Sequence, residues 1–106
     1  MKRLLLVFLS LIFTACTSQP VVKEEPINLR LTTTTSVNDS GLLEYLRQYI
    51  LEDLNMNLEI VSLGSGAAIE AGQRGDADVL LVHSPAAEET FVKDGYGLKR
   101  STFMYK

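Results

Sequence analysis

The sequence contains few of the residues that most metal, disulfide and redox chemistry requires. Its 106 residues include one cysteine, one histidine, three prolines and no tryptophan. A single cysteine excludes an intramolecular disulfide and any zinc site built on two or four cysteines. Acidic side chains outnumber basic ones by 13 to 10, and a net charge of −3 is unlike the basic surface that nucleic acids require. We therefore expect no metal centre, no cofactor and no nucleic-acid partner.

The residues that are present suit one small globular domain. Hydrophobic residues make up 46% of the sequence and charged residues 22%. These proportions are typical of a folded domain rather than of a disordered chain or a multi-spanning membrane protein. A mass of 11.7 kDa allows one domain at most, because domains usually contain ~100–150 residues.

The first residues have the pattern of a bacterial lipoprotein signal. Lys2 and Arg3 precede an apolar run over 4–13, which is shorter than the ~20 residues that a membrane-spanning helix needs. The run ends in Phe-Thr-Ala-Cys, which resembles the lipobox, where the cysteine is lipidated and becomes the mature N-terminus. The pattern predicts a lipoprotein signal peptide over 1–15 and lipidation at Cys16. A plain secretory signal is the alternative.

A polar segment separates this signal from the part of the chain that is expected to fold. Residues 16–27 are polar and charged and contain Pro20 and Pro26, a composition typical of a tether. The domain is expected over 28–106. A lipid on Cys16 would anchor it to a membrane, in the periplasm or on the outer face of the cell membrane.

From residue 28 onward, strand-like and helix-like segments alternate. Strands are predicted at about 28–33, 58–63 and 79–83, and helices at 42–54, 67–74 and 86–94. The order βαβαβα predicts an α/β fold with a parallel sheet and helices on both faces. The third strand is almost continuously apolar, so we expect it to be buried on both faces.

The connections between these elements are also predicted. Residues 34–41 are expected to form a polar loop that supplies a helix cap, and 55–57 a turn. Along 42–54 the apolar positions follow helical spacing as far as Leu54, and Tyr45 and Tyr49 beside them are expected to pack. Candidate caps in the polar loop are Ser36, Asp39 and Ser40.

Two loops that follow the predicted strands are suited to binding an anion. The segments 33–36 and 64–67 each lie before a helix, where free backbone N–H groups and the helix dipole favour negative charge. Hydroxyl groups add donors, and glycine allows a close approach. Neither loop contains lysine or arginine. A capped turn or a flexible connection is the alternative, and the Gly-Ser-Gly segment lacks the Gly-Lys-Ser/Thr of a P-loop.

Other polar residues favour structural roles. His83 ends the predicted third strand, and a lone histidine is more often structural than a ligand. Asp76 and Asp78 precede that strand and indicate turn and capping contacts rather than a catalytic pair. Glu88 and Glu89 lie in the first turn of a helix, where negative charge complements the dipole.

Three segments resemble the tungstate-binding (Tup-type) proteins of ABC importers. Residues 31–46 contain a Thr-Thr-Thr-Ser run followed by Asp-Ser-Gly-Leu-Leu, and 64–68 read Gly-Ser-Gly-Ala-Ala. Residues 75–89 and 94–97 are similar to the third βα unit of the family. The resemblance covers about 29–105 and implies a periplasmic-binding-protein-like fold with two lobes. This chain is then expected to hold a βαβαβα half-lobe, truncated and without the second lobe that closes over the ligand.

The resemblance also implies a site and a function. It implies an extracytoplasmic solute-binding component that delivers tungstate, or molybdate, to a cognate ABC permease. Ser65 stands where the family commonly has threonine and keeps the hydroxyl, whereas Thr32 stands where alanine is common. The residues that would donate to the oxyanion are Thr34, Thr35, Ser36, Ser65, Gly66 and Ala67.

Three alternatives remain open at the level of sequence. A protein of the same fold would bind sulfate or phosphate through the same neutral loops. An anion-handling enzyme such as a phosphatase is disfavoured, because no base–nucleophile pair is apparent near the loops. The third alternative is a truncated surface lipoprotein that binds no anion.

Overall fold

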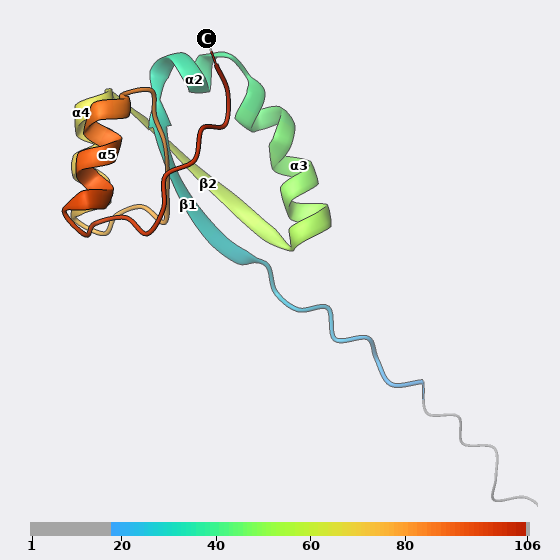
Figure 1. Ribbon diagram of the computed structural model, residues 1–106. Coiled ribbons are helices and arrows are strands. Elements are labelled where there is room, and N and C mark those ends of the chain that lie inside the picture. The colour runs from blue at the N-terminus through green and yellow to red at the C-terminus, as the bar shows by residue number, and fades with distance from the viewer. Residues whose placement is uncertain (1–17, 106) are drawn as a thin grey trace, which may run out of the picture.

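The computed structural model describes residues 18–105 (Figure 1). The predicted signal peptide over 1–15 and the lipidation site Cys16 lie outside the described residues. Residues 18–26 form neither helix nor strand, and they are exposed and lead away from the domain. Within 18–105, no helix has the length and apolar character needed to span a membrane.

Three parallel strands form one sheet. The strands are β1 (Ile27–Thr34), β2 (Met56–Leu63) and β3 (Val79–Leu81), in the order β2-β1-β3. The register pairs Thr34 with Leu63 on one side of β1 and Thr33 with Leu81 on the other. The carboxyl ends of all three strands therefore meet at one edge of the sheet, which we call the carboxyl edge.

Helices cover both faces of this sheet (Figure 1). Helix α3 (Leu42–Leu54) lies on one side, and α4 (Ser65–Gln73) and α5 (Pro85–Lys93) lie on the other. Each helix follows a strand in the chain, as parallel pairing requires. This arrangement confirms the predicted α/β half-lobe with a parallel sheet and helices on both faces.

The core lies between α3 and one face of the sheet. Leu31, Leu43 and Leu58 are buried there, and burying a leucine contributes about 1.5–3 kcal/mol. On the opposite face, Ala68 and Ala71 of α4 are buried, and their small side chains let this helix lie close to the sheet. Buried side chains therefore lie on both faces of the sheet.

Two helix ends depend on the left-handed conformation. Gly75, which follows the C-cap residue Arg74 of α4, has φ of 78°. Asn55 has φ of 51° after α3, and its N–H donates to the Leu51 carbonyl at 3.1 Å. Met56 then begins β2, so the turn predicted over 55–57 consists of Asn55 alone.

The polar loop predicted over 34–41 contains a short helix. Helix α2 (Thr35–Asp39) follows β1 directly, because serine, threonine, asparagine and aspartate tolerate a first helical turn as well as a loop. The capping prediction was wrong in detail, since Gly41 is the N-cap of α3. Of the candidate caps, Ser40 accepts the Leu42 N–H at 3.3 Å.

The prediction for the third strand was wrong in two respects. β3 ends at Leu81 instead of 83, and Val79 is 40% exposed. The physical reason is its place in the sheet: β3 is an edge strand and pairs only with β1 among the residues that the structure describes. A continuous apolar run therefore did not mark burial on both faces.

The tyrosines of α3 do not pack against the core. Tyr45 and Tyr49 are exposed, and their rings contact each other with centroids 5.4 Å apart. Leu54, which was expected to continue the apolar stripe, is 59% exposed. Burial in β1 is likewise confined to its carboxyl half, so the end of α3 lies where the sheet is least covered.

Candidate functional site

The two predicted anion loops start from neighbouring strands. Thr34 is the last residue of β1 and pairs with Leu63, the last residue of β2. The first loop continues from Thr34 into α2, and the second from Gly64 into α4. The sheet register thus places the two helix N-termini side by side at the carboxyl edge.

The second loop presents free backbone donors. Gly64 is the N-cap of α4, and the first turn of the helix closes when the Ala68 N–H donates to the Gly64 carbonyl at 2.8 Å. The N–H groups of Ser65, Gly66 and Ala67 precede this bond and have no acceptor within the helix. No side chain caps them. A helix start of this kind attracts an anion.

This turn is also open to solvent. Gly66 and Ala67 are exposed and Ser65 is half-buried. A Cβ atom added at Gly66 would meet no other atom within 4 Å. The structure starts α4 at Ser65, two residues before the predicted start, so the candidate donors belong to the first helical turn rather than to a loop.

The first loop presents hydroxyl groups from β1 and α2. The Thr34 side chain is buried, and its Oγ1 lies 3.3 Å from the Oγ of Ser36. Thr35 and Ser36 are exposed on α2. Thr32 and Thr33 lie inside β1 and are buried. The loop thus combines one buried hydroxyl group with two exposed ones.

His83 adjoins this loop, although the sequence favoured a purely structural role for it. The Nε2 atom of His83 lies 3.2 Å from the Oγ of Ser36, a residue 47 positions earlier in the chain. The register of β1 and β3 explains the contact, because Thr33 pairs with Leu81 and both chains continue past the carboxyl edge. The sequence placed His83 at the end of a predicted strand, but it did not indicate that Ser36 would be its neighbour.

Ser36 and His83 form a base–hydroxyl pair that the sequence did not reveal. A hydrolytic site also requires a group that orients the imidazole through its second ring nitrogen. Within residues 18–105, no hydrogen bond joins the Nδ1 atom of His83 to a carboxylate. The described residues also contain no cluster of three or more histidine, cysteine, aspartate or glutamate side chains suited to a metal ion.

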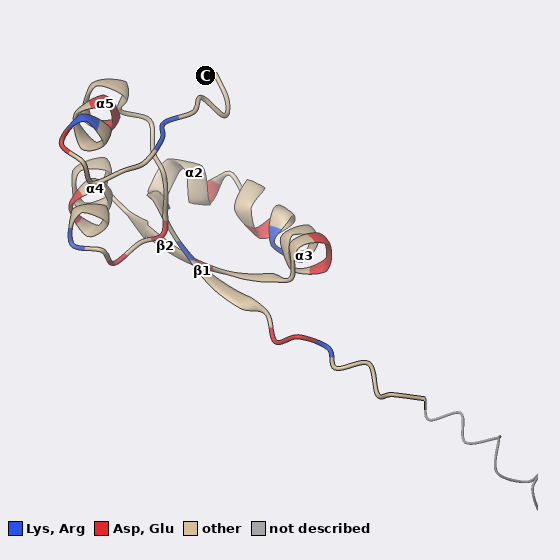
Figure 2. Ribbon diagram, turned by 60° about the horizontal axis from the view of Figure 1, so that its bottom comes forward, with Lys and Arg blue, Asp and Glu red and all other residues tan. Residues whose placement is uncertain are grey.

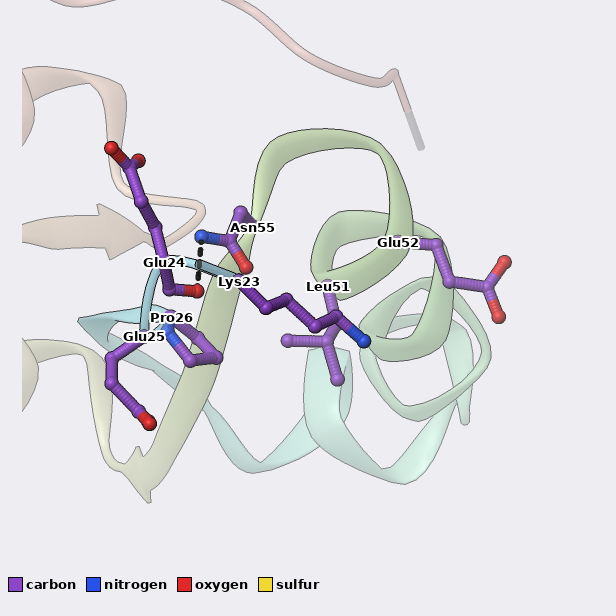
Figure 3. Close-up of a pocket in the computed structure, with 7 residues that line it drawn as sticks. All are labelled: Lys23, Glu24, Glu25, Pro26, Leu51, Glu52 and Asn55. Carbon is purple, nitrogen blue, oxygen red and sulfur yellow. Dashed lines mark hydrogen bonds between the residues drawn. The ribbon is translucent and has the colours of Figure 1, made fainter. Parts of the chain in front are cut away.

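A groove of about 980 Å³ extends from this pair across one side of the sheet. Ser36 and His83 are among the residues that line it, and β3, α5 and the segment 98–105 form most of its walls. Much of the lining is apolar and includes Leu80, Phe91, Tyr96 and Leu98. A smaller cavity of about 510 Å³ lies beside the segment before β1, where the Asn55 Nδ2 donates to the Glu24 carbonyl at 3.2 Å (Figure 3).

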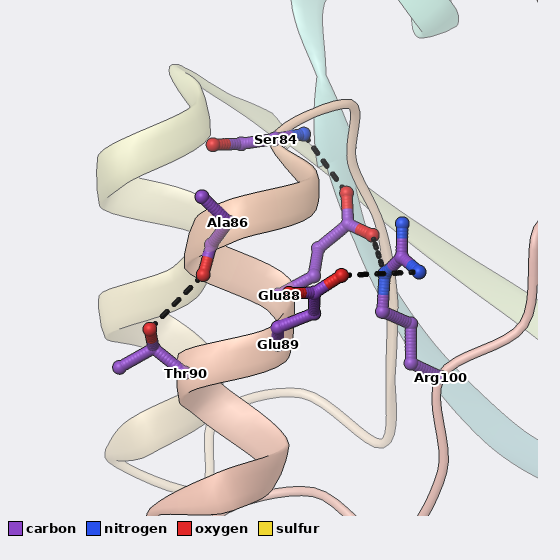
Figure 4. A network of polar contacts seen from close by, with 6 residues as sticks. All are labelled: Ser84, Ala86, Glu88, Glu89, Thr90 and Arg100. Carbon is purple, nitrogen blue, oxygen red and sulfur yellow. Dashed lines mark hydrogen bonds and ion pairs between the residues drawn. The ribbon is translucent and has the colours of Figure 1, made fainter.

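A polar network holds the segment 98–105 beside α5 (Figure 4). The Ser84 N–H donates to Glu88 Oε1 at 2.8 Å, and the Arg100 Nε donates to Glu88 Oε2 at 2.7 Å. Arg100 also lies 3.9 Å from the carboxylate of Glu89. Glu88 therefore caps the start of α5, as its place in the first turn indicated, and also binds a distant arginine, which the sequence did not indicate.

Charged side chains are otherwise found mainly on the helices and in the segment before β1 (Figure 2). Asp78 binds Arg30, and Asp76 binds Arg74 at 3.0 Å. The two aspartates are thus engaged separately, as expected for structural residues. The candidate anion loops contain neutral donors alone.

Comparison with known proteins gives the family of this fold and site. The model of the PBP superfamily domain matches residues 17–106, and the chain belongs to this family. It is 43% identical over 116 residues to the tungstate-binding protein TupA of Peptoclostridium acidaminophilum, covering 99% of this chain and 41% of that protein. It is 41% identical over 70 residues to the tungstate-binding protein TupA of Campylobacter jejuni, covering 66% of this chain and 26% of that protein.

A solved structure is similar in both fold and sequence. The tungstate-binding protein TupA from Desulfovibrio alaskensis G20 superposes with a TM-score of 0.69 at 40% identity. The match covers 70% of this chain and 30% of that one. The chain thus spans less than half the length of the relatives that it matches.

Proposed function

We propose that this chain is the extracytoplasmic solute-binding component of an ABC importer for a tetrahedral oxyanion, tungstate or molybdate. The observation that carries this proposal is the start of α4, where three backbone N–H groups have no helical acceptor and lie beside the hydroxyl groups at the end of β1. Similar proteins support the choice of substrate, because two relatives and one solved structure are tungstate-binding proteins.

The donor set suits capture and release of a dianion. Thr34, Thr35 and Ser36 would bind the oxyanion from the first loop, and the second loop would add three more residues, Ser65, Gly66 and Ala67. All of these donors are neutral, and a hydrogen bond to a charged group contributes about 1.5–3 kcal/mol. An oxyanion held in this way is released without breaking a salt bridge, which suits a carrier that delivers it to a permease.

The proposal includes the location of the protein. A signal peptide over 1–15 would direct export, and a lipid on Cys16 would anchor the chain in the periplasm or on the outer face of the cell membrane. Residues 16–27 would be the tether and 28–106 the binding lobe. The exposed, irregular course of residues 18–26 supports the tether.

Metabolic labelling with a fatty acid tests the anchor. The wild-type chain is expected to incorporate label, and Cys16→Ala is expected to incorporate none, because this chain has one cysteine. Ser18→Ala is a neighbouring control that should keep the label. Equal labelling of Cys16→Ala and wild type would overturn the lipidation proposal.

Calorimetry with tungstate, molybdate, sulfate and phosphate tests the substrate. We expect heat from tungstate or molybdate, and loss of at least about a hundredfold in affinity when Ser36→Ala and Ser65→Ala are combined, since two hydrogen bonds to a charged group are removed. Thr90→Ala is a matched control, because its Oγ1 donates to the Ala86 carbonyl within α5.

The outcomes separate the alternatives. Tightest binding of sulfate or phosphate would keep the site and change its substrate. No heat from any of the four anions would contradict the proposed function. Unchanged affinity in the double variant, with binding by the wild type, would show that the oxyanion occupies another place.

A further inference from the structure

We propose that His83 is a proton-dependent positioning residue for the oxyanion site, directing the hydroxyl proton of Ser36 so that the anion binds more tightly when His83 is protonated. The inference rests on the proposed function of this site. Its basis is the 3.2 Å separation between the Nε2 of His83 and the Oγ of Ser36, which joins the end of β3 to α2.

The hydroxyl group of Ser36 carries a single proton, and His83 determines where that proton points. A serine hydroxyl donates one hydrogen bond and accepts two. When the neutral imidazole of His83 carries its proton on Nδ1, its Nε2 accepts the Ser36 hydroxyl proton, which is then unavailable to an anion. In the imidazolium both ring nitrogens are donors, so Nε2 donates to Ser36 and the hydroxyl proton becomes free to bind an oxyanion.

A second, buried side chain also adjoins the Ser36 hydroxyl group. The Oγ1 of Thr34 lies 3.3 Å from the Oγ of Ser36 and is held at the end of β1, where Thr34 is 3% exposed. The Ser36 oxygen therefore has two side-chain partners, the buried Thr34 and the exposed His83. A threonine hydroxyl group carries no charge, so of these two partners only the imidazole changes its charge with pH.

The other charged groups around the groove are carboxylates, a lysine and arginines. Asp78 lies at the start of β3 and is paired with Arg30, while Glu88 of α5 is paired with Arg100. Lys99 comes from the segment 98–105, and α2 carries Asp39. Carboxylates titrate well below pH 6 and lysine and arginine well above pH 8, whereas an ordinary histidine titrates between them.

The sequence provides a direct probe of this inference, because His83 is its one histidine. The imidazole ring protons can therefore be followed by NMR without ambiguity, in the full chain, with and without tungstate. We expect tungstate to raise the pKa of His83. Linkage then requires the affinity for tungstate to fall with rising pH by the same factor, about tenfold for a pKa rise of about one unit.

Calorimetry between about pH 6 and 8 supplies the second measurement. The affinity of the wild type is expected to decline with pH, whereas His83→Gln, which keeps a hydrogen-bonding side chain but does not titrate, should show a flat profile. Ser36→Ala should lose most of the pH dependence, because it lacks the hydroxyl group that His83 directs. A purely structural role for His83 would alter stability without altering this profile.

The results distinguish this inference from the function on which it rests. Tungstate binding by the wild type with no change in the pKa of His83 would overturn the inference and leave the function intact. Equal pH dependence in wild type and His83→Gln would do the same. A pH profile that persists in Ser36→Ala would refute control through the hydroxyl group. Absence of tungstate binding at every pH would overturn the proposed function itself.

Discussion

Arg30 and Asp78 bind each other through both their side chains and their main chains. The guanidinium group donates to the carboxylate from Nε at 3.1 Å and from Nη2 at 2.8 Å. The Arg30 N–H also donates to the same carboxylate at 2.9 Å, and the Asp78 N–H donates to the Arg30 carbonyl at 2.9 Å. Because Asp78 immediately precedes β3, this ion pair and its backbone hydrogen bonds fix the beginning of the edge strand that leads to His83.

The Arg30–Asp78 ion pair predicts a specific dependence of stability on pH. Hydrogen bonds from the Arg30 side chain, followed by that from its backbone, lower the pKa of Asp78 from its usual 3.8 to about 2. A carboxyl group whose pKa is lower in the folded state than in the unfolded state stabilises the fold at a pH above the unfolded-state pKa. This contribution is lost as the pH falls through the folded-state pKa. The Tm difference between wild type and Asp78→Asn should therefore have its largest value above about pH 4 and decrease as the pH falls toward about 2.

Asp76→Asn is the control for this experiment. Its carboxylate binds Arg74 two residues away and joins no separate strands. Thermal unfolding followed by circular dichroism should show a smaller Tm change for Asp76→Asn than for Asp78→Asn at neutral pH. A constant Tm difference between wild type and Asp78→Asn across the acid range would contradict the assignment.

Two leucines that are four positions apart in the sequence are expected to differ greatly in their contribution to stability. Leu58 of β2 is 1% exposed, so Leu58→Ala should lower the free energy of unfolding by about 2–5 kcal/mol. Leu54, at the end of α3, is 59% exposed, and Leu54→Ala should change it by less than about 1 kcal/mol. Urea denaturation of the two variants measures the difference, and equal losses would show that the core is placed wrongly.

Replacing each of two glycines of α4 by alanine should change the Tm in different directions. A methyl group at Gly72 would approach Leu80 to 2.8 Å and Phe91 to 3.0 Å, whereas one at Gly66 would meet nothing within 4 Å. Overpacking costs about 1–3 kcal/mol, and alanine in a helix is favoured over glycine by about 0.5–1 kcal/mol. Gly72→Ala should therefore lower the Tm, and Gly66→Ala should keep or raise it.

The same Gly66→Ala variant separates binding from stability. Its methyl group projects near the free N–H groups of the first turn, where the oxyanion is proposed to lie. We expect weaker tungstate binding by calorimetry from a chain that is at least as stable as wild type. Full affinity in Gly66→Ala would argue that the anion does not approach the backbone at this turn.

Much of the fold was predictable because it depends on local patterns. The alternation of strands and helices was confirmed, since β-branched runs, helical apolar spacing and Pro85 at the start of α5 act within a few residues. The features that were missed depend on neighbours that the sequence does not display. Apolar character alone could not show that β3 is an edge strand, nor that Tyr45 and Tyr49 contact each other in solvent.

The candidate site was likewise predictable only where it depends on local sequence patterns. The sequence marked both loops, because hydroxyl groups and glycines directly follow predicted strands. It did not mark the contact between Ser36 and His83, which arises only when β1 and β3 pair. Nor did it mark the pairs Arg30–Asp78 and Glu88–Arg100, whose partners lie 48 and 12 residues apart. Pairs of this kind follow from the way the elements pack in the fold rather than from any local pattern.

The direction of β1 gives the molecule a polarity. Its first residue, Ile27, continues the segment that leads back toward Cys16, and its last, Thr34, lies beside the anion loops. Eight residues are separated by seven steps of ~3.3 Å, which place about 23 Å between these two ends. Under the proposed anchoring, a lipid surface would be connected through the tether to one end of the central strand, and the anion would arrive at the other. The attached end and the binding edge would then lie at opposite ends of one strand, so attachment to the lipid would leave the binding edge uncovered.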